Sequence, residues 1–426
     1  MVGKTSSLDL EFARSQFPGL SRGWAFFDNA GGSQILKGAL ERINTFLIEK
    51  NVQIGGSYAV SQDAAKALYE AREAAMHLVN ARRPEEIVFG SSTTALLQNL
   101  ARAMQSQLSP GDEIIVTISD HESNIGPWER LKALGVNLKI WPLNKTTFTL
   151  DLDDLAQLMT PRTKLVCVTH ASNILGSINP IRQIADFVHA RGALLCVDAV
   201  AYAPHRAVDV QAFDADYYVF SLYKTYGPHY ALMYGKYDLL AELDTLYHYF
   251  YGKDKIPGKL EPGNPNYELA YSTCGIVDYL VELGARSGEN GTIRQKIEAA
   301  FVAITAQEDA LTERLLSYLR SRNDCSIIGQ SVNRESRRVP TISFRFDARD
   351  AAEICKAIDD QKIAIRFGDF HSRRLAEYLD LTDNNGMLRV SMVHYNTIEE
   401  VDQLTAALDR ILATEIGTTI GARQAG

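Results

Sequence analysis

The sequence predicts an α/β protein with a mostly parallel sheet and a smaller α+β unit toward its C-terminus. Between about residues 85 and 235, short β-branched runs alternate with amphipathic stretches. This alternation is typical of βαβ units, in which helices cover both faces of a parallel sheet. The length of 426 residues, 46% of them hydrophobic, is enough for a large core and suggests at least two domains.

The elements follow in order along the chain. The expected strands of the large sheet are EIVFG, DEIIVTI, VNLKIW, KLVCVTH, ALLCVDAV, DYYVFS and YALMYG, and the stretches 93–107, 123–134 and 181–191 between them are amphipathic. Residues 236–270 have no clear period, and we expect a crossing segment that covers the site or a subunit interface. A helix near 295–320, a strand at VPTISFRFD, a helix at 350–361, strands at KIAIRF and GMLRVSMV and a last helix at 397–413 complete the prediction.

These elements divide into two expected domains. The large domain is placed at residues 21–285, and the small one at 1–20 and 286–414. The remaining residues 415–426 are expected to form a flexible tail.

Charge and composition narrow the class of partner. The net charge of −8 disfavours nucleic acid and anionic membrane surfaces. We find neither a signal peptide nor an uninterrupted apolar run of membrane-spanning length, so a cytoplasmic location is expected. Five scattered cysteines without C-x-x-C spacing argue against a disulfide framework and against a metal site.

Lys224 is the strongest candidate for chemistry. A lysine on a loop is often a solvated surface group. Here the loop follows the strand that ends at Ser221, and ligands of parallel sheets bind at the carboxyl ends of strands. A partly desolvated lysine amine can attack a cofactor aldehyde at neutral pH and form a Schiff base.

Asp198 and Asn173 follow two other strands of the same predicted sheet. A carboxylate at the end of a buried strand needs a partner, which a helix cap or a salt bridge would supply. The pyridinium nitrogen of a cofactor would serve equally, because the carboxylate then keeps the ring protonated as an electron sink. The amide of Asn173 is suited to a cofactor phenol oxygen, although by itself it would be a turn residue.

Three further positions carry side chains that could bind parts of a cofactor or substrate. Thr93 and Thr94 begin a helix, whose free N–H groups and dipole favour a phosphate, although most such clusters are only caps. His121 could stack on a flat ring or belong to a turn. Arg389 lies in an apolar strand, and a buried arginine needs an anion such as the α-carboxylate of an amino acid.

Taken together, these segments resemble the successive blocks of a known family. The segments are FFDNAGG, FGSSTTALLQNLA, GDEIIVTISDHESNIGPW, TKLVCVTHASNILGSINPI, DYYVFSLYKTYGPH, LEPGNPN and LRVSMVHYNTIEEVDQL. Over about residues 25–410 the chain resembles the class V aminotransferase family, in its cysteine desulfurase-like branch. The resemblance implies a fold-type I enzyme that uses pyridoxal 5′-phosphate (PLP), has a sheet of the seven-stranded type, acts on a small amino acid and forms a homodimer with shared active sites.

The resemblance also implies a role for each candidate. Lys224 would carry PLP as a Schiff base, and the other cofactor contacts would come from Asp198 (pyridinium), Asn173 (phenol oxygen), His121 (ring stacking) and Thr93, Thr94 and Ser221 (phosphate). Arg389 would bind the substrate carboxylate with Asn29 close by. Asn264, where threonine is usual in the family, would reach the phosphate of the partner subunit.

One loop departs from the desulfurase pattern. Desulfurases of this branch carry a nucleophilic cysteine after an Arg-x-Gly sequence, and this cysteine takes the sulfur as a persulfide. Here the loop reads IRFGDFHSRR, with His371 at the matching position, and no cysteine follows Cys355. Ala201 and Tyr223 also replace a usual glutamine and histidine. The residues expected to attach the cofactor therefore match the family, whereas those expected near the substrate differ.

We therefore expect chemistry at Cβ without a protein persulfide. Arg389 would anchor the amino acid, Lys224 would remove the Cα proton, and a sulfur group would leave from Cβ, giving pyruvate and ammonia. His371 could protonate the leaving group, or it could be an exposed loop histidine. The alternatives are a decarboxylase, an aldol-type C–C bond enzyme, an aminotransferase or an epimerase of the same fold. A non-enzymatic scaffold is disfavoured because Lys224, Asp198 and Arg389 are all present.

Overall fold

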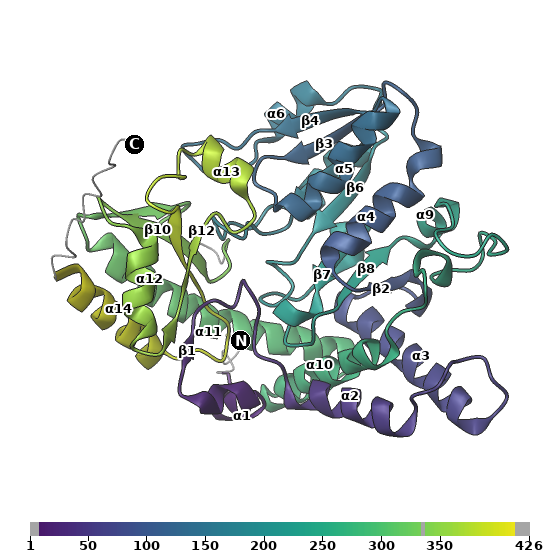
Figure 1. Ribbon diagram of the computed structural model, residues 1–426, viewed down its shortest axis with the longest axis horizontal. Coiled ribbons are helices and arrows are strands. Elements are labelled where there is room, and N and C mark those ends of the chain that lie inside the picture. Colours follow the sequence, from purple (N-terminus) through teal and green to yellow (C-terminus); the bar gives the residue numbers. More distant parts are fainter. Residues whose placement is uncertain (1–7, 334–336, 414–426) are drawn as a thin grey trace, which may run out of the picture.

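The computed structural model describes residues 8–333 and 337–413. Over these residues the strands form sheets of seven, four and two strands. The large sheet has the order β2-β8-β7-β6-β5-β3-β4, and β8 alone runs against its neighbours β2 and β7. The predicted mostly parallel α/β architecture is therefore confirmed (Figure 1).

All seven strands of the large sheet coincide with segments that the sequence predicts as strands, and only β5 begins one residue earlier, at Thr163. Their bounds are β2 (Ile87–Gly90), β3 (Glu113–Thr117), β4 (Asn137–Trp141), β5 (Thr163–Thr169), β6 (Leu194–Asp198), β7 (Tyr217–Ser221) and β8 (Ala231–Gly235). Helices α4 (Thr93–Ala103), α5 (Gly126–Glu129), α6 (Leu152–Leu158), α7 (Ile181–His189) and α8 (Val210–Phe213) lie in the connections between these strands, and α9 (Tyr237–Glu242) follows β8.

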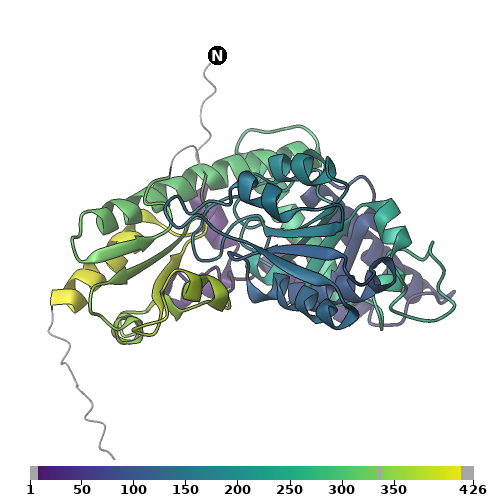
Figure 2. The same ribbon diagram turned by 90° about the horizontal axis from the view of Figure 1, so that it is seen from above.

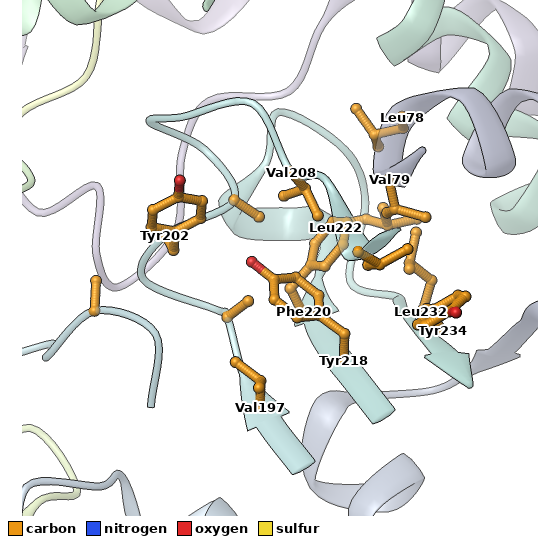
Figure 3. Packing of buried hydrophobic residues seen from close by; sticks show 14 of the residues in the cluster. Leu78, Val79, Val197, Tyr202, Val208, Tyr218, Phe220, Leu222, Leu232 and Tyr234 are labelled. Carbon is orange, nitrogen blue, oxygen red and sulfur yellow. The ribbon is translucent and has the colours of Figure 1, made fainter. Parts of the chain in front are cut away.

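Alternate residues of each buried strand enter cores on opposite faces of the sheet, because successive side chains of a strand point to opposite sides. In β7, Tyr218 and Phe220 enter the core that contains Leu78 and Val79 of α3 (Figure 3). Tyr217 and Val219 enter the other core, with helix α4 and Trp128 of α5. The carboxyl ends of the parallel strands are thus held between two packed layers.

The second unit is built on a four-stranded antiparallel sheet of order β12-β13-β10-β9. Its long helix α11 has its first half in the core of the large sheet and its second half in the core of the small one. Figure 2 shows the two units side by side, with this helix running along both. The bounds are β9 (Cys325–Ile328), β10 (Thr341–Phe346), β12 (Arg366–Gly368), β13 (Met387–Ser391), α11 (Ile293–Arg320), α12 (Ala351–Asp359), α13 (Arg373–Tyr378) and α14 (Ile398–Ala413).

Several elements differ from the sequence prediction. Stretch 123–134 is a series of short helical segments, in which α5 begins at Gly126 and Pro127 and is followed directly by a tighter turn at Arg130–Leu134. The predicted strand KIAIRF divides at Ile365 into β11 (Ile363–Ala364), which pairs with β1 (Ala25–Phe26), and β12, which pairs with β13. Helices α1 (Leu10–Ser15), α2 (Lys37–Glu49), α3 (Ala59–Val79) and α10 (Tyr267–Arg286) have no counterpart in the prediction.

The proposed domain boundaries remain a prediction. Ala25 and Phe27, which the prediction assigns to the large domain, pack in the core of the C-terminal unit. The predicted tail 415–426 lies outside the described residues. Within the described part of the chain, no helix is long and apolar enough to cross a membrane. The same residues contain no group of three or more His, Cys, Asp or Glu side chains that could hold a metal ion.

Candidate active site

A cavity of about 540 Å³ lies at the carboxyl ends of β5, β6 and β7. Eight of the predicted site residues line it, namely Lys224, Asp198, Asn173, His121, Thr93, Thr94, Ser221 and His371. Arg389, Asn29 and Asn264 are not part of its wall. Gln98, Glu122 and Arg130 also line the cavity, and the sequence prediction missed them.

Lys224 ends a short helical turn directly after β7, with its Nζ 5.7 Å from the centre of the Tyr223 ring. Burial lowers the pKa of its amine to about 8, and the charge of Arg389 adds to this effect. About one lysine side chain in ten is then neutral at pH 7, compared with a far smaller fraction for an exposed lysine. The site therefore holds an amine that can act as a nucleophile and a base.

Asp198 is the last residue of β6 and is only 4% exposed. Its Oδ1 accepts a hydrogen bond from the backbone N–H of Val200 at 2.9 Å. Burial raises the pKa of this carboxyl to about 6, while that hydrogen bond and the charge of Lys224 act in the opposite direction. No described residue donates to Oδ2, so this oxygen is available to a cationic N–H group in the cavity.

Two pairs of hydroxyl groups surround the first turn of α4. Thr93 Oγ1 lies 2.7 Å from Ser221 Oγ, and this pair is buried. Thr94 Oγ1 lies 2.7 Å from Ser123 Oγ, in a more exposed position. Together with the free N–H groups at the start of the helix, the four hydroxyls form a cradle suited to a phosphate group.

His121 and His371 both line the cavity, and the centres of their rings lie 5.4 Å apart. Burial, together with the charge of Lys224, lowers the pKa of His121 to about 3, so this imidazole is neutral at physiological pH. Its Nδ1 accepts from the backbone N–H of Ser123 at 3.1 Å, which leaves the proton on Nε2. A neutral, flat ring of this kind can stack on an aromatic cofactor.

The loop that carries His371 is fixed to the large domain. Asn173 Nδ2 donates to the carbonyl of Phe370 at 2.9 Å, and Ser372 Oγ donates to Asn173 Oδ1 at 2.9 Å. The backbone N–H of Glu122 donates to the carbonyl of His371 at 2.9 Å. Phe370 and His371 have φ angles of 54° and 58°, a strained conformation that these contacts maintain. One N–H of the Asn173 amide remains for a ligand.

Arg389 lies on β13 and is buried, but it already has a counter-ion that sequence reasoning missed. Its Nη2 lies 3.1 Å from Oδ1 of Asp28, and its Nη1 donates to the carbonyl of Asn173 at 3.2 Å. Arg366 lies 3.5 Å from the other oxygen of Asp28. Burial lowers the pKa of Arg389 to about 10, so the guanidinium stays charged at neutral pH. An incoming carboxylate would therefore share this cation with Asp28.

Asn29 lies beside this pair, but its polar atoms are used within the protein. Its Nδ2 donates to the carbonyls of Phe26 and Ser391, and its Oδ1 accepts from the hydroxyl of Tyr395. In this arrangement Asn29 joins the N-terminal segment to the small unit and has no free group for a substrate. The predicted contact of Asn264 concerns a second subunit and remains a prediction.

The residues present fit PLP. A partly desolvated amine, a carboxylate with a free oxygen, a neutral imidazole and a hydroxyl cradle at a helix start all face one cavity. These are the groups that an aldehyde, a pyridinium nitrogen, an aromatic ring and a phosphate require.

Known proteins resemble this chain over most of its length. A sequence model of the class V aminotransferase family matches residues 25–404. The aminotransferase-like protein FGM3 of Gibberella zeae is 43% identical over 96% of this chain and 100% of its own. The cysteine desulfurase-like protein ustD of Aspergillus flavus is 33% identical over 96% of this chain and 92% of its own.

A solved structure supports the same relation. The cysteine desulfurase CsdA of Escherichia coli superimposes with a TM-score of 0.81 at 26% identity, covering 95% of this chain and 98% of that one.

Proposed function

The chain belongs to the class V aminotransferase family of PLP-dependent enzymes, and we propose that it cleaves a C–S bond at the β-carbon of an amino acid without forming a protein persulfide. The observation that carries the proposal is the cavity wall at residue 371. A histidine stands there, on a fixed loop, where the resemblance places the persulfide cysteine of desulfurases.

The positions of the cysteines support this proposal. Cys167 and Cys196 lie inside the large sheet, and Cys274, Cys325 and Cys355 lie on α10, β9 and α12. None of the five lines the cavity. Burial raises the pKa of the Cys274, Cys325 and Cys355 thiols to about 12, which disfavours the thiolate that would accept sulfur.

Different residues of the cavity would serve different steps of such a reaction. When bound, PLP would take up the negative charge left on Cα as a bond to that carbon breaks. Lys224 would hold the cofactor and, as a neutral amine, would accept the proton that leaves Cα. Asp198 Oδ2 would keep a proton on the ring nitrogen, and His121 would cover one face of the ring and exclude water.

Substrate binding and departure of the sulfur group would depend on residues from both units. Arg389 would share its charge between Asp28 and the α-carboxylate of the amino acid. His371, at the cavity wall beside His121, would give a proton to the departing sulfur. His371 is exposed, but the bonds from Asn173 and Glu122 to the backbone of its loop hold the residue at the cavity wall, which supports this role.

We also propose that the protein acts as a homodimer. Large apolar side chains are exposed on α2 and α3 and in the segment before α10, among them Ile48 (82%), Tyr249 (96%) and Phe250 (65%). Exposed apolar surface of this kind is typical of a subunit interface. Sedimentation equilibrium would test this proposal, and a monomer at micromolar concentration would contradict it.

The reaction is tested by incubating the PLP-loaded protein with cysteine and with S-alkyl cysteines, and by measuring sulfide or thiol, pyruvate and ammonia. We expect these products in equal amounts, and none from the Lys224→Ala variant. Release of CO₂, or of an aldehyde together with a shortened amino acid, would instead indicate cleavage of a C–C bond. Either result without sulfur release would refute the proposed reaction.

A further inference from the structure

Arg130 is a cation on the cavity wall that has no partner among the described residues. The two acidic side chains near it in the sequence are both bound elsewhere. Arg374 pairs with Glu122, with Nε 2.9 Å from Oε2, and also with Glu129, which Lys132 contacts at 3.0 Å as well. The charge of Arg130 is therefore left without a counter-ion at the cavity wall.

The wall between the hydroxyl cradle and Arg130 is continuous. Ser123, Gly126, Pro127 and Arg130 follow one another at helical spacing, and all four line the cavity. A Cβ atom at Gly126 would meet nothing within 4 Å except Glu122 Oε1 at 3.6 Å, so this part of the wall is open. A ligand can thus extend along this face from the cradle toward Arg130.

Arg130 differs in exposure from the inner part of the hydroxyl cradle. The inner hydroxyl pair, Thr93 and Ser221, is buried, whereas Thr94 and Arg130 are exposed. A group that enters from the mouth of the cavity can therefore reach Arg130 while the inner pair holds a phosphate.

We propose that Arg130 binds an acidic group at the far end of the substrate side chain. The inference rests on the proposed function, in which an amino acid is held at its α-carboxylate by Arg389. Under C–S cleavage, the preferred substrate is then a cysteine whose sulfur substituent ends in a carboxylate. His121, His371 and Arg130 all line this one cavity, which suits a side chain longer than that of cysteine.

The test compares isosteric acid and amide ligands. We would measure kcat/KM for S-carboxymethyl-cysteine and S-carbamoylmethyl-cysteine, and the dissociation constants of glutamate and glutamine by calorimetry, on the PLP-loaded protein. We expect each acid to be favoured about tenfold over its amide, as for one charge-assisted hydrogen bond near solvent. Arg130→Gln should abolish this ratio while leaving amide binding unchanged, and Arg130→Lys should retain part of it.

Lys132→Gln is the matched control, because Lys132 contacts Glu129 and does not line the cavity. This variant should keep the wild-type ratio. A ratio unaltered in Arg130→Gln, or a loss of PLP affinity in that variant with the ratio intact, would overturn the proposal. The latter result would assign Arg130 to the cofactor phosphate. Because binding of the glutamate and glutamine pair needs no C–S bond, a failure of the proposed reaction would be seen separately, as the absence of sulfur products.

Discussion

Asp198→Asn should make the cofactor-free protein more stable while it removes most of the activity. The carboxyl of Asp198 has its ordinary pKa of 3.8 in the unfolded chain and a pKa of about 6 in the folded protein, because it is buried. At about 1.4 kcal/mol for each unit of pKa, its ionisation in the folded protein costs about 3 kcal/mol. An asparagine has no ionised form, so the folded variant does not bear this cost in free energy of unfolding.

The pH dependence follows from the direction of the pKa change. Between about pH 4 and pH 6 the folded protein binds more protons at Asp198 than the unfolded chain does. The contribution of this group to the free energy of unfolding is therefore highest below pH 4 and is lost as the pH rises through 6. The advantage of Asp198→Asn should grow from about 1 kcal/mol at pH 4.5 to about 3 kcal/mol at pH 7.

Urea denaturation of the two cofactor-free proteins at both pH values measures this difference. Lys224 and Asp120 are charged or titratable neighbours, but they are present in both proteins. Asp153→Asn, at an exposed position of α6, is the control and should change the free energy of unfolding little. Equal stability of wild type and Asp198→Asn at both pH values, or a less stable variant at pH 7, would refute the reasoning.

Three other substitutions test individual contacts. Lys224→Ala should lose turnover and the visible absorption of covalently held cofactor, and an unchanged spectrum would exclude this lysine. Arg389→Ala should weaken amino-acid binding by about 2–5 kcal/mol, as for loss of a buried charged partner, without changing the affinity for an amine that lacks the carboxylate; equal losses for both ligands would contradict the role. Ser372→Ala leaves Asn173 Oδ1 without its donor and should reduce stability by about 1 kcal/mol. It should also speed hydrogen exchange at the Glu122 amide, and unchanged exchange there would show that the loop is held by other contacts.

Much of the fold could be predicted because the apolar sequence of each buried strand is enough to indicate a strand. Runs such as KLVCVTH are apolar on both faces, as expected for strands with a core on each side, and α7 and α11 follow the helical period. Helix α10 lacks such a period because most of its residues are buried, including Gly275, whose Cβ would meet the backbone of Gly38 at 2.5 Å. A helix that is buried on nearly all sides has no polar stripe to reveal it.

The candidate site was predictable where one residue and its strand end define the position, as for Lys224, Asp198 and His121. The residues missed owe their importance to tertiary contacts. Asp28 meets Arg389 across 361 positions of sequence, and Ser372 meets Asn173 across 199. Arg130 matters because Arg374 binds the neighbouring carboxylates, and no local pattern contains that information.

The central claim is that sulfur leaves this enzyme without passing through a protein persulfide. Mass spectrometry of the intact protein after turnover with cysteine, in the absence of reductant, tests it most directly. His371→Cys, which places a thiol at the cavity wall, is the positive control and should gain one sulfur atom. The account predicts an unchanged mass for the wild-type protein. A wild-type protein that carries one additional sulfur on a cysteine, and passes it to an acceptor thiol, would contradict the account.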